Sequence, residues 1–176
     1  MKNVTMVIGS MRDGNSAFIA RRIKEELPAV SAFVLGGNIG YCTGCLVCDE
    51  THQCVIRDGM DSIIESIKES DILLIVTPVR YSLMSGDVKV FIDRLNPTAI
   101  AETIVGKEVL AIAIGQTEEA DGTIASALSS IEMFADNANM PFGGGYPVYS
   151  CYGSDELSNK EEIVIDIINW IKEKIK

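Results

Sequence analysis

Two long apolar runs constrain the fold of this 176-residue chain more than any other feature. Residues 71–77 (DILLIVT) and 108–115 (EVLAIAIG) are apolar at nearly every position, so an extended segment would be apolar on both of its faces. A β-strand of this kind needs cover on both sides, as the central strands of a parallel sheet have between layers of helices. The two runs therefore predict an α/β fold.

Shorter apolar segments and helical patterns alternate with these runs. We expect the other strands at 4–8, at 31–35 and within 140–150. Apolar residues at three- and four-residue spacing predict helices from 16 to 27, from 58 to about 67, over 85–95, from 121 to about 134 and from 158 to 175. The last helix is expected to start with a capping box formed by Ser158 and Glu161. Five strands alternating with five helices predict a doubly wound parallel sheet with helices on both faces, whose ligands bind at the carboxyl ends of the strands.

Size and charge exclude several classes of function. The length suits a single domain over residues 1–176. The net charge of −10 would repel a polyanion, so no nucleic-acid partner is expected. No apolar run reaches the roughly 18 residues of a membrane span, and the stretch at 4–8 is too short for a signal-peptide core. We therefore expect no membrane association and a cytoplasmic location, where cysteines serve as metal ligands or redox groups rather than disulfides.

The loop after the first expected strand, residues 9–16 (GSMRDGNS), has the character of an anion site. Its backbone N–H groups and the positive end of the following helix attract negative charge. Candidate binding residues are Ser10, Arg12, Gly14, Asn15 and Ser16. The glycine spacing copies that of a nucleotide-triphosphate loop, but Asn15 stands where that loop has its lysine, which favours a ligand with one phosphate. The alternative is a plain strand-to-helix turn capped by Ser16.

The loop after the third expected strand, residues 77–86 (TPVRYSLMSG), suits a flat aromatic ligand. A proline-led turn presents backbone N–H groups and Tyr81 presents an aromatic face, a combination that an isoalloxazine ring requires. Candidate residues here are Pro78, Val79, Arg80, Tyr81, Ser82 and Met84. After the fourth strand, Gly115 and Gln116 are expected to close over the other edge of the flavin. Lys89 and Asp93 are expected to form a surface ion pair.

The two loops resemble those of the NAD(P)H-dependent FMN reductase branch of the flavodoxin-like proteins. Residues 9–16 are similar to the FMN-phosphate loop of that family. Residues 77–94 resemble its T-P-x-Y-x-x-x-x-S-G-x-x-K-x-F-x-D-R signature, with Arg80 at the place of the aromatic residue. The resemblance implies strand order 2-1-3-4-5, FMN as cofactor and NAD(P)H as a donor. It implies no catalytic side chain, because the chemistry is carried by flavin N5.

Four of the five cysteines lie within thirteen residues, in a loop at about 37–55. Cys42, Cys45, Cys48 and Cys54 have the spacing C-x2-C-x2-C-x5-C, which suits the four corners of a [4Fe–4S] cluster. Zinc and free or redox-active thiols are alternatives. Cys151 lies outside the motif and is expected to be an ordinary buried thiol, and His52 an exposed loop residue.

The cysteine pattern resembles that of iron–sulfur flavoproteins. This second resemblance implies FMN together with a [4Fe–4S] cluster, a small redox carrier such as ferredoxin as partner, and a homodimer or homotetramer. The leading hypothesis is a redox protein that passes electrons between FMN and the cluster. One alternative is an NAD(P)H-dependent FMN, quinone or nitro-compound reductase without a cluster. Another is a non-catalytic module that binds a phosphorylated ligand.

Overall fold

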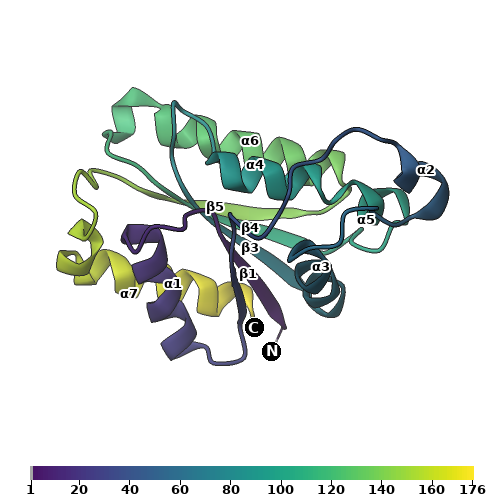
Figure 1. Cartoon of the computed structure of the whole chain (residues 1–176). Helices are drawn as coiled ribbons and strands as arrows, with labels where there is room; N and C mark the ends of the chain where they lie inside the picture. Colours follow the sequence, from purple (N-terminus) through teal and green to yellow (C-terminus); the bar gives the residue numbers. More distant parts are fainter. Residues whose placement is uncertain (1) are drawn as a thin grey trace.

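Five parallel strands form one sheet in the computed structural model, which describes residues 2–176. The strands are β1 (Val4–Ile8), β2 (Ser31–Val34), β3 (Ile72–Pro78), β4 (Glu108–Ile114) and β5 (Phe142–Val148). Their order is β2-β1-β3-β4-β5, and every neighbouring pair is parallel. The predicted doubly wound sheet and its flavodoxin-like strand order are confirmed (Figure 1).

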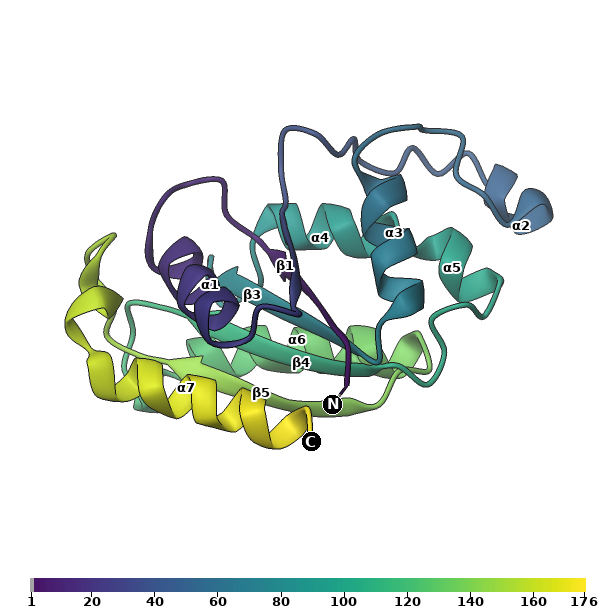
Figure 2. The same ribbon diagram turned by 90° about the horizontal axis from the view of Figure 1, so that it is seen from below.

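Seven α-helices occur in the described part of the chain. They are α1 (Asn15–Glu26), α2 (Val47–Thr51), α3 (Met60–Glu69), α4 (Gly86–Asp93), α5 (Asn96–Ile100), α6 (Thr123–Asn137) and α7 (Glu161–Lys174). Helices α1 and α7 lie together on one face of the sheet, and α3, α4 and α6 lie on the other (Figure 2). No helix among residues 2–176 combines the length and apolar character that a bilayer-spanning segment requires.

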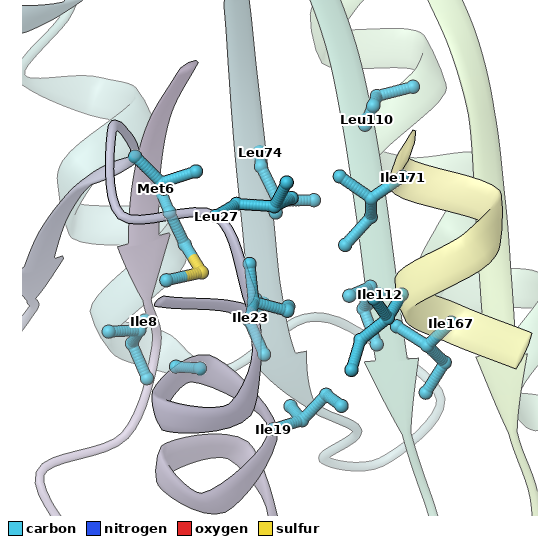
Figure 3. Close-up of a cluster of buried hydrophobic side chains, with 14 of the residues drawn as sticks. Met6, Ile8, Ile19, Ile23, Leu27, Leu74, Leu110, Ile112, Ile167 and Ile171 are labelled. Atoms are coloured by element: carbon cyan, nitrogen blue, oxygen red, sulfur yellow. The ribbon is translucent and has the colours of Figure 1, made fainter. Parts of the chain in front are cut away.

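The two-sided apolar runs are explained by the packing of β3 and β4. Successive residues of a strand face opposite sides of the sheet. On one face, Leu74 and Ile112 pack with Ile23 of α1 and Ile167 of α7 (Figure 3). The alternate strand residues, such as Ile75, belong to a second buried cluster with α3, α4 and α6. Full burial of one such aliphatic side chain stabilises the fold by about 1.5–3 kcal/mol.

The starts of α7 and α6 lie later in the chain than the sequence predicts. Residues 156–159 form a 3₁₀ turn, the hydroxyl of Ser158 donates to the Asp155 carbonyl at 2.6 Å, and α7 begins after Lys160 without a side-chain cap. The predicted capping box of Ser158 and Glu161 is therefore wrong. Helix α6 begins at Thr123 because Asp121 ends a separate 3₁₀ turn.

The carboxyl ends of all five strands meet at one edge of the sheet, where the loop after β5 turns towards α7. The short helices α2 and α5 lie at the opposite end of the molecule, and both views show this separation (Figures 1 and 2). Helix α4 runs from the first of these regions to the second, since it follows the loop after β3 and leads into α5.

Candidate functional site

One cavity of about 400 Å³ lies at the carboxyl edge of the sheet. It is lined by the loops after β1, β3, β4 and β5, the arrangement expected for a doubly wound sheet. The structure brings together there all but one of the candidates for cofactor binding, namely Ser10, Arg12, Gly14, Asn15, Ser16, Pro78, Val79, Arg80, Tyr81, Ser82, Gly115 and Gln116. The exception is Met84, which is half-buried against the core cluster beneath α3, α4 and α6.

The end of the cavity beside α1 has the features of an anion site. Helix α1 begins after Gly14, which has an extended backbone and no side chain that could cap the helix. The first N–H groups of the helix therefore remain for a ligand. The Arg12 guanidinium lies over this glycine: a Cβ added to Gly14 would lie 3.1 Å from Arg12 Nε and 3.2 Å from the Ser154 carbonyl oxygen. The combination of a helix N-terminus and an arginine suits a phosphate group.

Asn15 has a positioning role in addition to the binding role expected from the sequence. Its side-chain Nδ2 donates to the Gly153 carbonyl at 2.8 Å, and its Oδ1 accepts a hydrogen bond from the Leu157 N–H at 2.9 Å. Both amide atoms therefore hold the loop after β5 against the start of α1. One N–H of Nδ2 is used in this way, so the second N–H of Nδ2 and the backbone N–H of Asn15, which lines the cavity, remain as donors for a ligand.

The loop after β3 is a tight two-residue turn. Arg80 and Leu83 exchange backbone hydrogen bonds of 2.9 and 3.0 Å, while Tyr81 and Ser82 between them have φ values of +49° and +64°. Positive φ at both central residues is the pattern of a type I′ turn, which normally favours asparagine and glycine. The N–H of Val79 is bonded to the Ile114 carbonyl at 2.8 Å, so within residues 79–83 the N–H groups of Tyr81 and Ser82, at the tip of the turn, remain for a ligand. Tyr81 is fully exposed at that tip.

A close approach between β1 and α4 explains the glycine at position 9. A Cβ added to Gly9 would lie 2.4 Å from Val88 Cγ2 and 2.6 Å from Ser85 Oγ. Ser85 is held in place because its N–H donates to Thr77 Oγ1 at 3.0 Å. The absence of a side chain at position 9 therefore lets the loop after β1 lie against the start of α4.

The loop after β5 also contributes to the cavity, which the sequence did not predict. Cys151, Tyr152 and Gly153 line the cavity, and the Cys151 N–H bonds the Gly115 carbonyl at 2.9 Å. Ile114, Thr117 and Thr123 complete the lining. Strand position could have indicated this loop, because the carboxyl end of a fifth parallel strand reaches the same edge as the others. Cys151 is buried, as expected of an ordinary buried or partly buried thiol, and burial raises the pKa of this thiol.

The four clustered cysteines line a second, smaller cavity. Cys42, Cys45, Cys48 and Cys54 surround a space of about 40 Å³ together with residues at the end of α4 and the start of α5. Cys42 and Cys45 are exposed, and Cys48 and Cys54 are half-buried. Among residues 2–176, no three cysteine, histidine or acidic side chains are close enough to form a preassembled metal group. Four sulfur ligands around one space are nevertheless the donor set that a cubane cluster uses.

A buried ion pair fixes both ends of this cysteine loop. Arg94 is 1% exposed and donates to the Asp58 carboxylate at 2.8 and 3.1 Å. It also donates to the carbonyls of Gly40 at 2.6 Å and Ile56 at 3.2 Å, one on each side of the cysteines. Burial alone would raise the pKa of Asp58, but the bonds from Arg94 and from the N–H groups of Gly40 and Met60 lower it to about 2.

The two cavities are separate. They have no lining residue in common: Ser82, before α4, belongs to the first, and Asp93, at the end of α4, belongs to the second. The exposed Lys89 and Asp93 on this helix form the predicted ion pair, with 2.5 Å between Nζ and Oδ1.

Comparison with known sequences identifies the family. The family model described as NADPH-dependent FMN reductase matches residues 2–150. The chain belongs to this family. A protein from Archaeoglobus fulgidus named iron-sulfur flavoprotein is 35% identical over 126 residues, which are 66% of this chain and 57% of that protein. Iron-sulfur flavoprotein MJ0731 from Methanocaldococcus jannaschii is 30% identical over 128 residues, 70% of this chain and 64% of that protein. The chain thus spans less than two thirds of the length of these relatives.

Solved structures of other proteins share the fold. The general stress protein 14 from Treponema denticola, solved in complex with FMN, has a TM-score of 0.70 at 10% identity, over 98% of this chain and 99% of that one. An NADPH-quinone reductase from P. pentosaceus has a TM-score of 0.69 at 14% identity, over 97% of each chain. At these identities, the likeness concerns the fold alone.

The first cavity of this FMN reductase family member fits the cofactor of its family. An arginine and a helix N-terminus lie at one end, as a phosphate requires, and the turn after β3 and residues 115–116 lie around the remainder. A Cβ added to Gly115 would lie 2.8 Å from Ile124 Cδ1, so a larger residue would push that loop outward. The structure therefore supports the expectation of FMN at the carboxyl edge of the sheet.

Proposed function

We propose that this chain is an FMN-dependent oxidoreductase that also carries a [4Fe–4S] cluster and passes electrons between the two. The observation that carries the proposal is that all four cysteines of the motif line the second cavity, which we call the cysteine cavity. It lies at the opposite end of α4 from the first cavity, which we call the flavin cavity. The names of the archaeal relatives support it as far as the aligned portions extend.

The side chains of this protein bind and orient rather than react. FMN exchanges two electrons at once and the cluster exchanges one, so together they link two kinds of redox partner. Arg12 and the start of α1 would hold the FMN phosphate, while Gly115 and the turn at 80–83 would set the position of the ring. Cys42, Cys45, Cys48 and Cys54 would bind the cluster iron atoms as thiolates.

The proposal extends to the setting in which the protein works. We propose that residues 1–176 act as one FMN-binding domain in the cytoplasm, as a homodimer or homotetramer. NAD(P)H or a small carrier such as ferredoxin would be the redox partner. Exposed apolar side chains on the cysteine loop, Tyr41, Leu46 and Val55, support contact of this loop with another protein surface.

The proposal is tested by measuring iron and acid-labile sulfide per FMN in protein purified without oxygen. We expect about four of each per flavin, the content of one cubane cluster. Stoichiometric FMN with neither iron nor sulfide would refute the cluster. Substitution of Cys45 by serine should lower the iron content, whereas the same substitution of Cys151, outside the second cavity, should not.

A cluster-free NAD(P)H-dependent FMN, quinone or nitro-compound reductase is the second candidate. The observation that favours it is that Cys42 and Cys45 are exposed and the cysteines are not preassembled as a metal group among residues 2–176. Rapid bleaching of the flavin by NADPH alone would support this candidate, and slow bleaching that a one-electron carrier accelerates would contradict it. Membership of a reductase family counts against the non-catalytic phosphate-binding module.

A further inference from the structure

A side-chain amide next to the cysteine cavity is directed at a sulfur atom. Asn96, the first residue of α5, places its Nδ2 3.3 Å from Cys48 Sγ. An amide nitrogen of this kind is a donor, and the sulfur is the acceptor. The acceptor becomes stronger when the sulfur carries negative charge, as it does in a metal-bound thiolate.

A second donor in the same wall of the cavity lacks a partner. The terminal nitrogens of Arg94 bind Asp58, Gly40 and Ile56, but its buried Nε has no hydrogen-bond partner among residues 2–176. A buried N–H without a partner costs about 1–3 kcal/mol.

Cys54 is the sulfur beside this guanidinium. Arg94 and Cys54 line the same cavity. The guanidinium charge is already balanced by Asp58, so the arginine can remain buried whether or not the cysteines hold a ligand.

We propose that Asn96 donates an N–H hydrogen bond to the sulfur of Cys48, that Arg94 Nε donates one to the sulfur of Cys54 once these cysteines hold the cluster, and that both bonds raise the reduction potential of the cluster. The inference rests on the proposed function and adds two positioning residues that no cysteine pattern indicates. Both come from the short segment that joins α4 to α5, so one piece of backbone presents both donors.

The physical reason is the distribution of charge on reduction. One electron, supplied by reduced flavin or by the carrier, adds one negative charge to the cluster and its sulfur ligands, with no bond made or broken. Hydrogen bonds to the sulfurs stabilise the more negative, reduced state more than the oxidised one. Loss of a donor therefore makes reduction less favourable.

The test is a redox titration of anaerobically reconstituted protein, with the cluster followed by EPR and the flavin by absorbance. Asn96→Ala should reduce the equilibrium constant for cluster reduction about tenfold, a shift of about 59 mV to more negative potential for one electron. The FMN potential should stay unchanged, because Asn96 does not line the flavin cavity. Asn169→Ala is the matched control: this exposed amide lies on α7, on the other face of the sheet from the cysteine cavity, and should leave both potentials unchanged.

Arg94→Lys provides a second variant, since lysine keeps the positive charge but has no Nε. We expect a more negative cluster potential. If this variant loses its iron or fails to fold, the comparison of Asn96→Ala with its control decides the question. A cluster potential unchanged by Asn96→Ala, at full iron content, would overturn the inference and leave the proposed function intact. Equal shifts of the cluster and flavin potentials would also overturn it. A wild-type protein without iron would overturn the proposed function and this inference with it.

Discussion

The low pKa of the Asp58 carboxyl group makes the stability of the protein depend on pH. Its pKa in the folded protein is about 2, below its ordinary value of 3.8. In the acid range the unfolded chain then binds more protons than the folded one, so stability is present above about pH 4 and is lost as the pH falls towards 2. The shift corresponds to about 2 kcal/mol. Urea unfolding at a series of pH values should show this loss.

Asp58→Asn tests the assignment. The variant leaves the buried Arg94 charge without its carboxylate, which should cost about 3 kcal/mol at neutral pH. The part of the acid destabilisation due to Asp58 should also disappear. If the free energy of unfolding of the variant fell with decreasing pH as steeply as that of the wild type, other carboxylates would be the cause of the acid destabilisation.

Arg12 should control the affinity for FMN through the phosphate. Arg12→Gln removes a charged donor beside the start of α1, and we expect FMN binding to weaken by about tenfold to a hundredfold, the effect of one charged hydrogen bond. Riboflavin, which lacks the phosphate, should bind equally well to both proteins in a fluorescence titration. Arg57→Gln is the control, since Arg57 is an exposed arginine outside the flavin cavity. Equal weakening of FMN and riboflavin would show that Arg12 does not act on the phosphate.

Individual residues were predictable where local geometry determines their role. The phosphate loop could be found because a glycine-rich turn before a helix exposes N–H groups, whatever the rest of the chain does. The role of Asn15 could not, because its partners Gly153 and Leu157 are distant in sequence. Met84 likewise belongs to the predicted loop in sequence, but its half-buried side chain packs against the core cluster beneath α3, α4 and α6.

At the scale of a single element, the turn at residues 80–83 is under backbone strain. A left-handed conformation costs about 1–2 kcal/mol for a residue with a Cβ, and Tyr81 and Ser82 both adopt it. Ser82→Gly should therefore raise the free energy of unfolding by about 0.5–1 kcal/mol, after allowance for the greater freedom of glycine in the unfolded chain. Denaturant titration measures the change. Leu83→Gly, at a position without positive φ, should destabilise the protein. A gain in stability from this control substitution would contradict the explanation by backbone strain.

Long elements were predictable and short ones were not. The apolar runs that form β3 and β4 require burial on both faces, and this requirement alone predicts central strands of a sheet. Helices α2 and α5 have five residues each, too few for stability by themselves, and they exist because they contact each other beside the cysteine loop. The failed capping box of Ser158 shows the same limit, since a 3₁₀ turn competes for that hydroxyl.

At the scale of the whole molecule, the two cavities should fill independently. A variant with serine at positions 42, 45, 48 and 54 should lose iron but bind FMN with unchanged affinity, because no residue lines both cavities. Arg12→Gln should give the reverse, a protein with normal iron content and weakened FMN binding. Metal analysis and flavin fluorescence on the two variants measure both quantities. Loss of FMN from the four-serine variant would contradict the separation.

Helix α4 has one end at each cavity, and this separation also has a consequence for the evolution of the family. Because no residue lines both cavities, we expect that a lineage that lost one cysteine would keep a folded flavoprotein, and that a lineage that gained all four would not need to alter its flavin cavity. Selection could therefore add or remove the cluster without passing through an inactive ancestor. Cluster-bearing and cluster-free forms should then be intermingled on the family tree rather than divided at a single branch.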